Sequence, residues 1–284
     1  MILAPLRGVT VRCFRRTFAA EIAAAGFTEA VTPFVAANAG ADPLKDRELK
    51  PDPAEGPLPF AVTPQFIGKD PASLRFALAR VKSAGYGVAD LNAGCPFPMV
   101  RNKGRGSGLL RTPDVLARML EAGCAVMGER RFSVKVRLGV ERPDEILSLA
   151  PVFNSFPLRR IAVHARTAVQ MYEGECDWAA FDAFAAVSEN PVVRNGGPTL
   201  PPPDAMADDV MVGRPFVRSL GERGDAKSLL DRYVEASLEE LKSGRAVLGR
   251  MKELLAYWKE LPRWRGVWRT AKLARTLAEF RLAL

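Results

Sequence analysis

The chain has 284 residues, 48% of them hydrophobic, and carries a formal net charge of +9, so it can bury the core of one large domain and its basic balance favours a polyanionic partner. Its four cysteines form no C-x-x-C pair and its single histidine is His164, which argues against a disulfide framework and a metal site. We see neither a signal peptide nor an apolar run long enough to cross a bilayer, so we expect a cytoplasmic protein without membrane association.

Strand-like and helix-like segments alternate along the first 222 residues. Eight strands are predicted, at residues 2–4, 28–34, 60–67, 86–91, 131–138, 160–164, 191–195 and 209–213. Helices are predicted at residues 11–25, 70–84, 112–127, 143–154 and 177–188. Two of these begin with a polar residue and a proline, at Asp70-Pro71 and Thr112-Pro113, as helix starts commonly do. This alternation predicts an α/β fold, a (β/α)8 TIM barrel over residues 1–222.

Three segments depart from the regular barrel pattern. Residues 36–59 are predicted to form a long surface excursion with one short helix at most. Between Asn195 and Asp209 the prolines leave room for about one helical turn, so we expect a truncated seventh helix. Residues 223–284 contain helix formers and no strand signal, which predicts a small all-helical C-terminal domain with helices at 225–243, 246–259 and 267–284.

The fourth predicted strand ends in Asn-Ala-Gly-Cys-Pro at residues 92–96, which places Cys95 on a loop at the C-terminal end of that strand. Glycines among Arg101, Lys103 and Arg105 predict that the following loop is flexible and cationic. A lone cysteine beside a turn is most often a buried structural residue. On such a loop, a thiol is also placed to act on an anionic ligand.

Functional residues of a (β/α)8 barrel gather at the C-terminal ends of its strands. Each polar residue at these ends has an ordinary interpretation by itself, as a loop amide, a charged layer, a satisfied imidazole or a turn glycine. Together they form seven ordered motifs: Ala-Pro-Leu-Arg-Gly-Val-Thr from residue 4, Gln-Phe-Ile-Gly-Lys-Asp-Pro from 65, Asn-Ala-Gly-Cys-Pro from 92, Lys-Val-Arg-Leu-Gly from 135, His-Ala-Arg-Thr from 164, Asn-Gly from 195 and Met-Val-Gly-Arg from 211. In order and spacing these motifs resemble the flavin site of the tRNA-dihydrouridine synthase family.

The resemblance implies an FMN cofactor, reduced by NADPH, and a reaction in which uridine of tRNA becomes 5,6-dihydrouridine with Cys95 as proton donor to C5. A neutral thiol can supply that proton, so Cys95 needs no depressed pKa. The expected cofactor-binding residues are Pro5, Leu6, Arg7, Gln65, Lys135, His164, Asn195, Gly196, Gly197, Gly213 and Arg214.

Elementary chemistry supports three of these assignments. Glycine-turn N–H groups and Arg214 suit the phosphate site that such barrels form after strands seven and eight. The ammonium of Lys135 would stabilise negative charge near N1 and O2 of a reduced flavin. The side-chain amide of Gln65 can both donate and accept, which suits the pyrimidine edge of the ring.

Residues from 242 onward include eleven Lys and Arg and three Glu, so their net charge of +8 accounts for nearly the whole excess. This segment more weakly resembles the family's helical RNA-binding domain. The residues expected to bind the substrate RNA are Asn92, Arg101, Lys103, Arg105, Arg137, Arg166, Arg250, Lys252, Arg265, Arg269 and Lys272.

The sequence also departs from the family pattern. Leu6 replaces a methionine, Val11 an acid and Gly197-Pro198 an Asp-Ile-like pair, and the seventh helix is short. Two other function classes therefore stay open. One is a flavin oxidoreductase of a small free pyrimidine, which would have no use for the basic C-terminal segment. The other is a non-catalytic RNA-binding relative. We expect a monomer that holds no metal.

Overall fold

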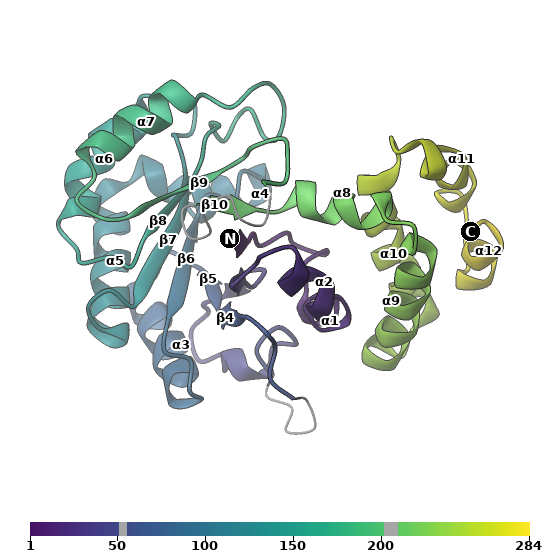
Figure 1. The fold of residues 1–284 in the computed structure, drawn as a ribbon. Coiled ribbons are helices and arrows are strands. Elements are labelled where there is room, and N and C mark those ends of the chain that lie inside the picture. The colour runs from purple at the N-terminus through teal and green to yellow at the C-terminus, as the bar shows by residue number, and fades with distance from the viewer. Residues whose placement is uncertain (51–55, 202–209) are drawn as a thin grey trace.

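Ten short parallel strands form one sheet in the computed structural model, which describes residues 1–50, 56–201 and 210–284 (Figure 1). The strands are β1 (Ile2–Leu3), β2 (Glu29–Val31), β3 (Val35–Ala36), β4 (Ala61–Thr63), β5 (Gln65–Ile67), β6 (Ala89–Ala93), β7 (Phe132–Arg137), β8 (Ile161–His164), β9 (Val192–Asn195) and β10 (Val210–Val212). Their order is β3-β5-β6-β7-β8-β9-β10-β1-β2-β4.

The two ends of this order belong to the same pair of chain segments. Only Pro64 separates β4 from β5, and β2 pairs with β4 while β3 pairs with β5. Segments 29–36 and 61–67 therefore lie side by side and close the ring. Each of these segments contributes two short strands at one position of the barrel, so the ten strands occupy eight positions. The predicted (β/α)8 barrel is confirmed.

Helices cover the outside of the barrel (Figure 1). They are α1 (Arg12–Thr17), α2 (Ala19–Ala24), α3 (Pro71–Ser83), α5 (Pro113–Met127), α6 (Glu145–Asn154), α7 (Trp178–Val187) and α8 (Arg214–Glu222), and short turns lie at η1 (Pro43–Lys45), α4 (Pro98–Arg101) and η2 (Gly106–Arg111). As predicted, the Asp70 carboxylate accepts the backbone N–H of Ser73 at 2.9 Å and caps α3. Thr112 precedes α5 without a side-chain cap, because its hydroxyl donates to Leu109 O instead.

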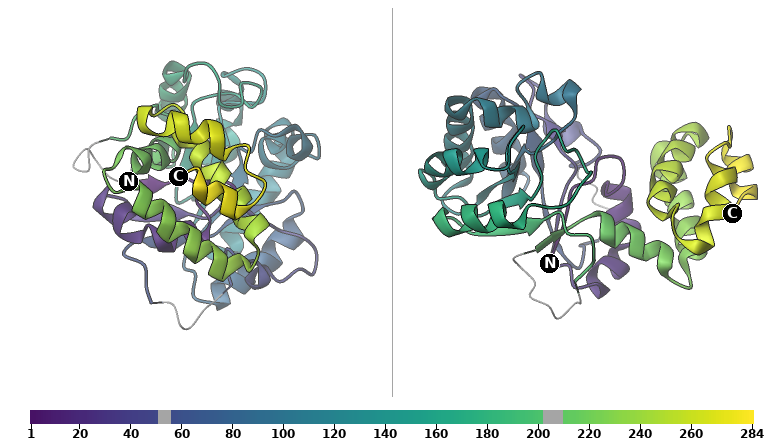
Figure 2. Two further views of the ribbon diagram at one scale, coloured as in Figure 1. Left: turned by 90° about the vertical axis from the view of Figure 1, so that its right-hand side faces the viewer. Right: turned by 90° about the horizontal axis from the view of Figure 1, so that it is seen from above.

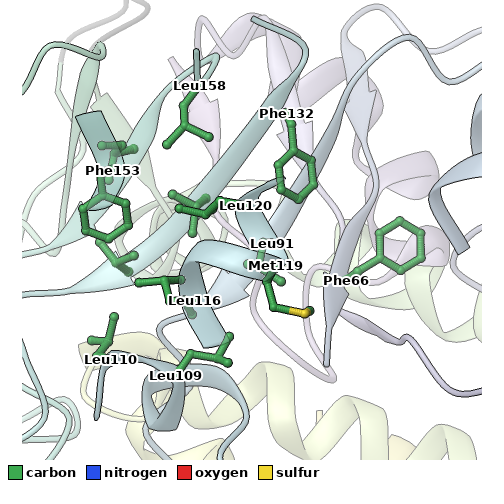
Figure 3. Packing of buried hydrophobic residues seen from close by; sticks show 14 of the residues in the cluster. Phe66, Leu91, Leu109, Leu110, Leu116, Met119, Leu120, Phe132, Phe153 and Leu158 are labelled. Carbon is green, nitrogen blue, oxygen red and sulfur yellow. The ribbon is translucent and has the colours of Figure 1, made fainter. Parts of the chain in front are cut away.

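The apolar faces of the strands and helices meet in two large clusters. The larger one fills the space between β5–β8 and the helices α3, α5, α6 and α7. Figure 3 shows part of it, where strand side chains pack with those of α5: Phe66, Leu91, Phe132, Leu116, Met119 and Leu120. This packing holds the central strands rigidly, so their C-terminal ends are fixed in position.

Residues 223–284 form four helices that lie beside α1 and α8 on one side of the barrel (Figures 1 and 2). They are α9 (Ala226–Leu241), α10 (Gly244–Trp258), α11 (Pro262–Ala271) and α12 (Leu277–Leu282). We refer to residues 223–284 as the helical segment. The prediction of an all-helical C-terminal region is confirmed, while the domain boundary between residues 222 and 223 stays a prediction.

The helical segment shares the second apolar cluster with the barrel. The ring of Tyr233 in α9 lies 5.8 Å from that of Phe14 in α1. Trp258 and Trp264 are buried and donate their indole N–H groups to Val217 O and Gly221 O of α8 at 2.7 and 2.8 Å. These tryptophans are core residues, so they are not available to stack on RNA bases.

Two predicted helices are wrong in extent. The helix predicted at 11–25 is interrupted at Phe18, which lies between α1 and α2. The helix predicted at 267–284 begins earlier, at Pro262, and is two helices, because Thr276 accepts Glu279 N at 3.1 Å and Glu279 accepts Arg275 N at 2.7 Å. These bonds start a new helix and let Phe280 point into the core.

The connection between β9 and β10 contains no helix in its described part, residues 196–201. Residues 202–209, where the truncated seventh helix is predicted, lie outside the described residues. Among the described helices, none combines the length and the apolar character needed to cross a membrane.

Candidate active site

A cavity of about 520 Å³ opens at the C-terminal ends of the barrel strands. Ten of the eleven predicted cofactor-binding residues line it: Pro5, Leu6, Arg7, Lys135, His164, Asn195, Gly196, Gly197, Gly213 and Arg214. Asn92, Cys95 and Arg137 also contribute to its wall. The barrel therefore brings together side chains that lie more than 200 residues apart in the sequence.

The described wall of the cavity is strongly cationic. Its cationic side chains are Arg7, Lys135, Arg137, Arg194 and Arg214, and its described wall contains no Asp or Glu. Gly213 and the first residues of α8 lie in the wall, so the N-terminal end of this helix adds positive potential. Such a cavity suits an anionic ligand.

Glycines leave room for a ligand at the same end of the cavity. Among the residues that the structure describes, a Cβ atom added to Gly197 would meet no atom within 4 Å, so these residues leave the backbone there open to a bound group. Gly196 has a φ of +117°, and a Cβ on it would lie 2.5 Å from Cδ2 of His164. A side chain at residue 196 would therefore displace the imidazole from the cavity wall.

Lys135 points across the barrel mouth from β7. Its Nζ donates to Oδ1 of Asn195 at 2.9 Å, and Asn195 in turn donates to Met211 O at 2.8 Å, which fixes the orientation of that amide. Burial, together with repulsion from Arg137, lowers the pKa of Lys135 to about 7. An anion bound beside this ammonium would relieve the desolvation cost.

His164 is buried next to this lysine. Burial lowers the pKa of His164 well below its ordinary range, and the charges of Arg137 and Lys135 act in the same direction. The ring is therefore a neutral donor and acceptor at physiological pH. Its Nε2 lies 3.2 Å from Nη1 of Arg166.

The backbone of Cys95 is held at both its N–H and its carbonyl. Its N–H donates to Oδ1 of Asn92 at 2.9 Å, and its carbonyl accepts from the N–H and the hydroxyl of Ser107 at 3.1 and 2.9 Å. Gly106, at a φ of +57°, packs so closely that a Cβ there would lie 2.8 Å from Cβ of Cys95. The predicted flexible loop is wrong for residues 106–111, which form the largely buried turn η2.

Cys95 contributes to the cavity wall although the residue is only 8% exposed. Burial raises the pKa of its thiol, and the nearby charge of Arg7 only partly opposes the shift. The group is therefore protonated at neutral pH. A fixed, neutral thiol can give up a proton to a base or carbanion placed in the cavity.

Gln65 is not in the cavity wall. It is fully buried inside the barrel, where its amide donates to Oδ2 of Asp90 and accepts from Nδ2 of Asn92, both at 2.8 Å. Its expected contact with a cofactor stays a prediction.

Arg137 and Arg166 bind backbone carbonyls. Arg137 is 1% exposed and donates to Gly94 O at 3.0 Å, Thr167 O at 2.8 Å and Met171 O at 2.6 Å. Arg166 donates to Gly174 O at 2.9 Å and to Gly196 O at 3.2 Å. Both arginines thus tie the loop after β8 to the strand ends, and their expected contact with RNA stays a prediction.

Two tyrosines in the cavity wall were not predicted. The ring centroid of Tyr172 lies 5.2 Å from Cζ of Arg137 and 5.0 Å from Cζ of Arg214. Tyr257 belongs to α10 of the helical segment. Tyr172 lies in the loop that follows His164, so its place near the site could have been inferred from the sequence. Tyr257 is brought to the barrel only by the tertiary structure.

The expected RNA-binding residues fall into separate groups. Arg101, Lys103 and Arg105 lie just beyond Cys95, in α4 and the turn before η2. In the helical segment, Arg250 pairs with Glu240 at 2.6 Å and Lys252 donates to Ala274 O at 2.6 Å, so both have partners within the segment. The exposed residues of that set lie on or next to α11: Arg265, Arg269 and Lys272.

In the part of the chain that the structure describes, no three His, Cys, Asp or Glu side chains gather where they could hold a metal ion. The cavity walls instead offer cations, amides and aromatic rings.

Comparison with solved structures supports the fold. An old yellow enzyme homologue from Zymomonas mobilis superimposes with a TM-score of 0.50 at 12% identity, covering 77% of this chain and 85% of that one. At this low identity the likeness concerns the barrel fold alone.

Comparison of sequences identifies relatives. A probable tRNA-dihydrouridine synthase of Rhodobacter capsulatus is 31% identical over 205 residues, which cover 69% of this chain and 59% of that protein. tRNA-dihydrouridine synthase B of Pseudomonas aeruginosa is 32% identical over 198 residues, covering 69% of this chain and 57% of that protein. Both alignments span less than two thirds of the relative. The family model of dihydrouridine synthases matches residues 2–218 of this chain, and the chain therefore belongs to the dihydrouridine synthase family.

Proposed function

We propose that this chain is a flavin-dependent oxidoreductase that reduces uridine in tRNA to 5,6-dihydrouridine, with FMN as cofactor and NADPH as reductant. The observation that carries the proposal is the placement of the protonated Cys95 thiol in the wall of a cationic cavity at the strand ends. Family membership and the names of the relatives support the same reaction.

The chemistry of the wall fits FMN. Its phosphate would bind the backbone N–H groups around Gly196 and Gly213 together with the guanidinium of Arg214, at the end of the cavity where Gly197 leaves open space. Lys135 would face the pyrimidine edge of the ring, where a reduced flavin carries negative charge. The remaining predicted ligands in the wall are Pro5, Leu6, Arg7, His164 and Asn195.

The proposed reaction adds two hydrogens to the C5–C6 double bond of the uracil ring. The hydride for C6 would come from a reduced FMN held by the residues named above. Cys95 gives its proton to C5 as the new C–H bond forms, and the thiolate then regains a proton from solvent. Because Asn92 and Ser107 fix the backbone of Cys95, the thiol is oriented before the substrate binds.

The uridine would have to leave the base stack to reach a cavity at the barrel mouth. Arg101, Lys103 and Arg105 follow Cys95 directly and would bind phosphates beside the entering nucleotide. Arg265, Arg269 and Lys272 would extend this contact to the helical segment. We also propose a cytoplasmic location, because the proposed substrate is tRNA. That the protein is a monomer stays a prediction.

One set of assays on the purified protein tests the proposal. We expect a yellow protein whose NADPH oxidation requires tRNA and whose product tRNA contains dihydrouridine. NADPH oxidation supported by free uracil or orotate, and not by tRNA, would identify a reductase of free pyrimidines. A colourless protein that binds RNA without oxidising NADPH would identify a non-catalytic relative.

A further inference from the structure

Four polar side chains form a continuous hydrogen-bond chain inside the barrel, below the cavity. Ser133 Oγ donates to Oδ1 of Asp90 at 2.7 Å, and Gln65 Nε2 donates to Oδ2 of Asp90 at 2.8 Å. Asn92 Nδ2 donates to Oε1 of Gln65 at 2.8 Å, and Oδ1 of Asn92 accepts the N–H of Cys95 at 2.9 Å. We call Ser133, Asp90, Gln65 and Asn92 the inner chain.

Three of the four members of the inner chain are closed to water, and Asn92 connects them to the cavity wall. Asp90, Gln65 and Ser133 are fully buried and Asn92 is 7% exposed. Solvent therefore cannot satisfy a donor or acceptor of these three buried residues that loses its partner, and each missing bond carries the full desolvation cost of the group left behind.

The inner chain also has a direction. Both oxygens of Asp90 accept, so the amide nitrogen of Gln65 must face Asp90 and its oxygen must face Asn92. The amide nitrogen of Asn92 must then face Gln65, which leaves its oxygen to accept the N–H of Cys95. An amide reversed at either position would set two donors or two acceptors against each other.

We propose that Asp90 is a positioning residue that fixes the place of the Cys95 thiol through Gln65 and Asn92. Asp90 does not line the cavity, so it acts on Cys95 through its two neighbours in the inner chain. The functional meaning rests on the proposed role of Cys95 as proton donor, whereas the positioning itself can be measured without catalysis.

The direction of the inner chain provides the test. Asn92→Asp alone sets a carboxylate at each end of Gln65, so its amide oxygen must face one of them. Adding Asp90→Asn restores a complete chain with the opposite direction: Ser133 donates to the new amide oxygen, the new amide donates to Gln65, and Gln65 donates to the carboxylate at 92. That carboxylate can still accept the N–H of Cys95.

The experiment measures how fast iodoacetamide alkylates Cys95 in the full-length protein, followed peptide by peptide by mass spectrometry. We expect Asn92→Asp and Asp90→Val to speed alkylation of Cys95 by about tenfold or more, because each leaves a buried polar group unsatisfied. We expect the double variant Asp90→Asn/Asn92→Asp to return to within about twofold of the wild-type rate.

Asp90→Asn alone is the matched control for charge. Ser133 already contacts Ala89 O at 3.2 Å, so its hydroxyl can turn to donate there and accept from the new amide, which keeps the rest of the chain intact. Its Cys95 rate should stay near that of the wild type. Cys124 on α5, which is half-buried against the core outside the inner chain, serves as an internal standard, since unfolding of the barrel would speed its labelling as well.

A wild-type Cys95 rate in both Asn92→Asp and Asp90→Val would overturn the proposal, as would a double variant that labels as fast as Asn92→Asp. Where Cys124 shows that Asp90→Val is unfolded, the comparison of Asn92→Asp with the double variant decides. Dihydrouridine formation is assayed in the same proteins. A wild-type protein that makes none would refute the proposed function, while the labelling rates would still test the positioning.

Discussion

Lys135 on β7 and Asn195 on β9 are joined by a 2.9 Å hydrogen bond that reaches past the intervening strand β8. The bond holds a half-buried ammonium in the cavity wall at the barrel mouth, where Arg137 and the glycines after β9 and β10 also contribute to the wall. No carboxylate shares the described wall, and the buried Asp90 below the cavity acts on the lysine only through its charge, so a bound anion would add a direct partner for the ammonium.

Lys135→Ala should therefore lower the flavin content of the purified protein and make the potential of any bound flavin more negative, because the reduced ring loses its cationic partner. Absorbance spectra and a potentiometric titration measure both. Lys45, an exposed lysine in η1, provides the matched control as Lys45→Ala. If Lys135→Ala has the absorbance spectrum and the flavin potential of the wild type, Lys135 does not contact the flavin.

Binding of FMN should weaken as the pH rises above about 7. The pKa of Lys135 is lowered to about 7, and a bound anion raises it, so binding takes up a proton between these two values. Affinity is then highest below the lower pKa and falls by up to about tenfold per pH unit above it. Fluorescence titration at several pH values measures this, and Lys135→Met should abolish the decline. A wild-type dissociation constant that stays level from about pH 7 to 9 would contradict the assignment.

Cys95→Ala should retain flavin and its reduction by NADPH but lose about a hundredfold or more of dihydrouridine formation, because the variant lacks only the proton donor. Stopped-flow absorbance and nucleoside analysis of the tRNA separate the two steps. Cys124→Ala, which changes a cysteine outside the cavity, should behave like the wild type. Wild-type product yield from Cys95→Ala would rule out the proposed role of the thiol.

The triple variant Arg265→Ala/Arg269→Ala/Lys272→Ala should bind tRNA more weakly without a change in flavin content. If all three residues contact phosphates, the slope of log K against log salt concentration flattens by roughly 0.7 to 0.9 for each lost contact. Titration of labelled tRNA at several salt concentrations measures this slope. A control triple variant at Lys45, Arg75 and Arg118 removes the same charge from exposed positions on the barrel. Equal slopes in the wild type and the α11 variant would show that the RNA binds another surface of the protein.

Glu29 should stabilise the barrel against acid. Burial disfavours its carboxylate, but hydrogen bonds from Arg160 and Arg159 outweigh this effect and lower the pKa of Glu29 to about 2. A depressed pKa means that the stabilisation is fully present above the unfolded-state pKa of 4.5 and is lost as the pH falls toward 2. Its size at neutral pH is about 3 kcal/mol.

Urea unfolding as a function of pH tests this assignment. Glu29→Gln should lower the free energy of unfolding at neutral pH and flatten its decline below about pH 4.5. Glu141, an exposed acid paired with Arg111 at 2.7 Å, offers a control as Glu141→Gln, with a change of about 0.5 kcal/mol or less. A Glu29→Gln protein with the pH dependence of the wild type would contradict the buried ion pair.

Local signals in the sequence accounted for the barrel and for most of its cavity. Strand ends are marked by polar residues after short apolar runs, so Lys135 and Asn195 could be placed in one site from their positions alone. The break before α12 also had a local signal, the spacing of Thr276 and Glu279, but continuous helix formers masked it.

The remaining features depend on contacts between distant segments. The glycines near Cys95 suggested a flexible loop, whereas Gly106 serves a close approach to the Cys95 backbone. Nothing near Arg137 in the sequence indicates that its donors meet carbonyls 30 and 34 residues away. Tyr257 reaches the cavity only because α10 packs on the barrel.

The position of Tyr257 next to Trp258 limits how this protein can be recombined with its relatives. Tyr257 lines the cavity, while Trp258 fits against Gly221 of α8 so closely that a Cβ on that glycine would lie 2.5 Å from the indole. A chimera that joins this barrel to a foreign helical segment must therefore preserve the small residue at 221, the indole that covers it and the ring beside that indole. A chimera that changes these three residues would alter both the cavity and the packing between the barrel and the helical segment.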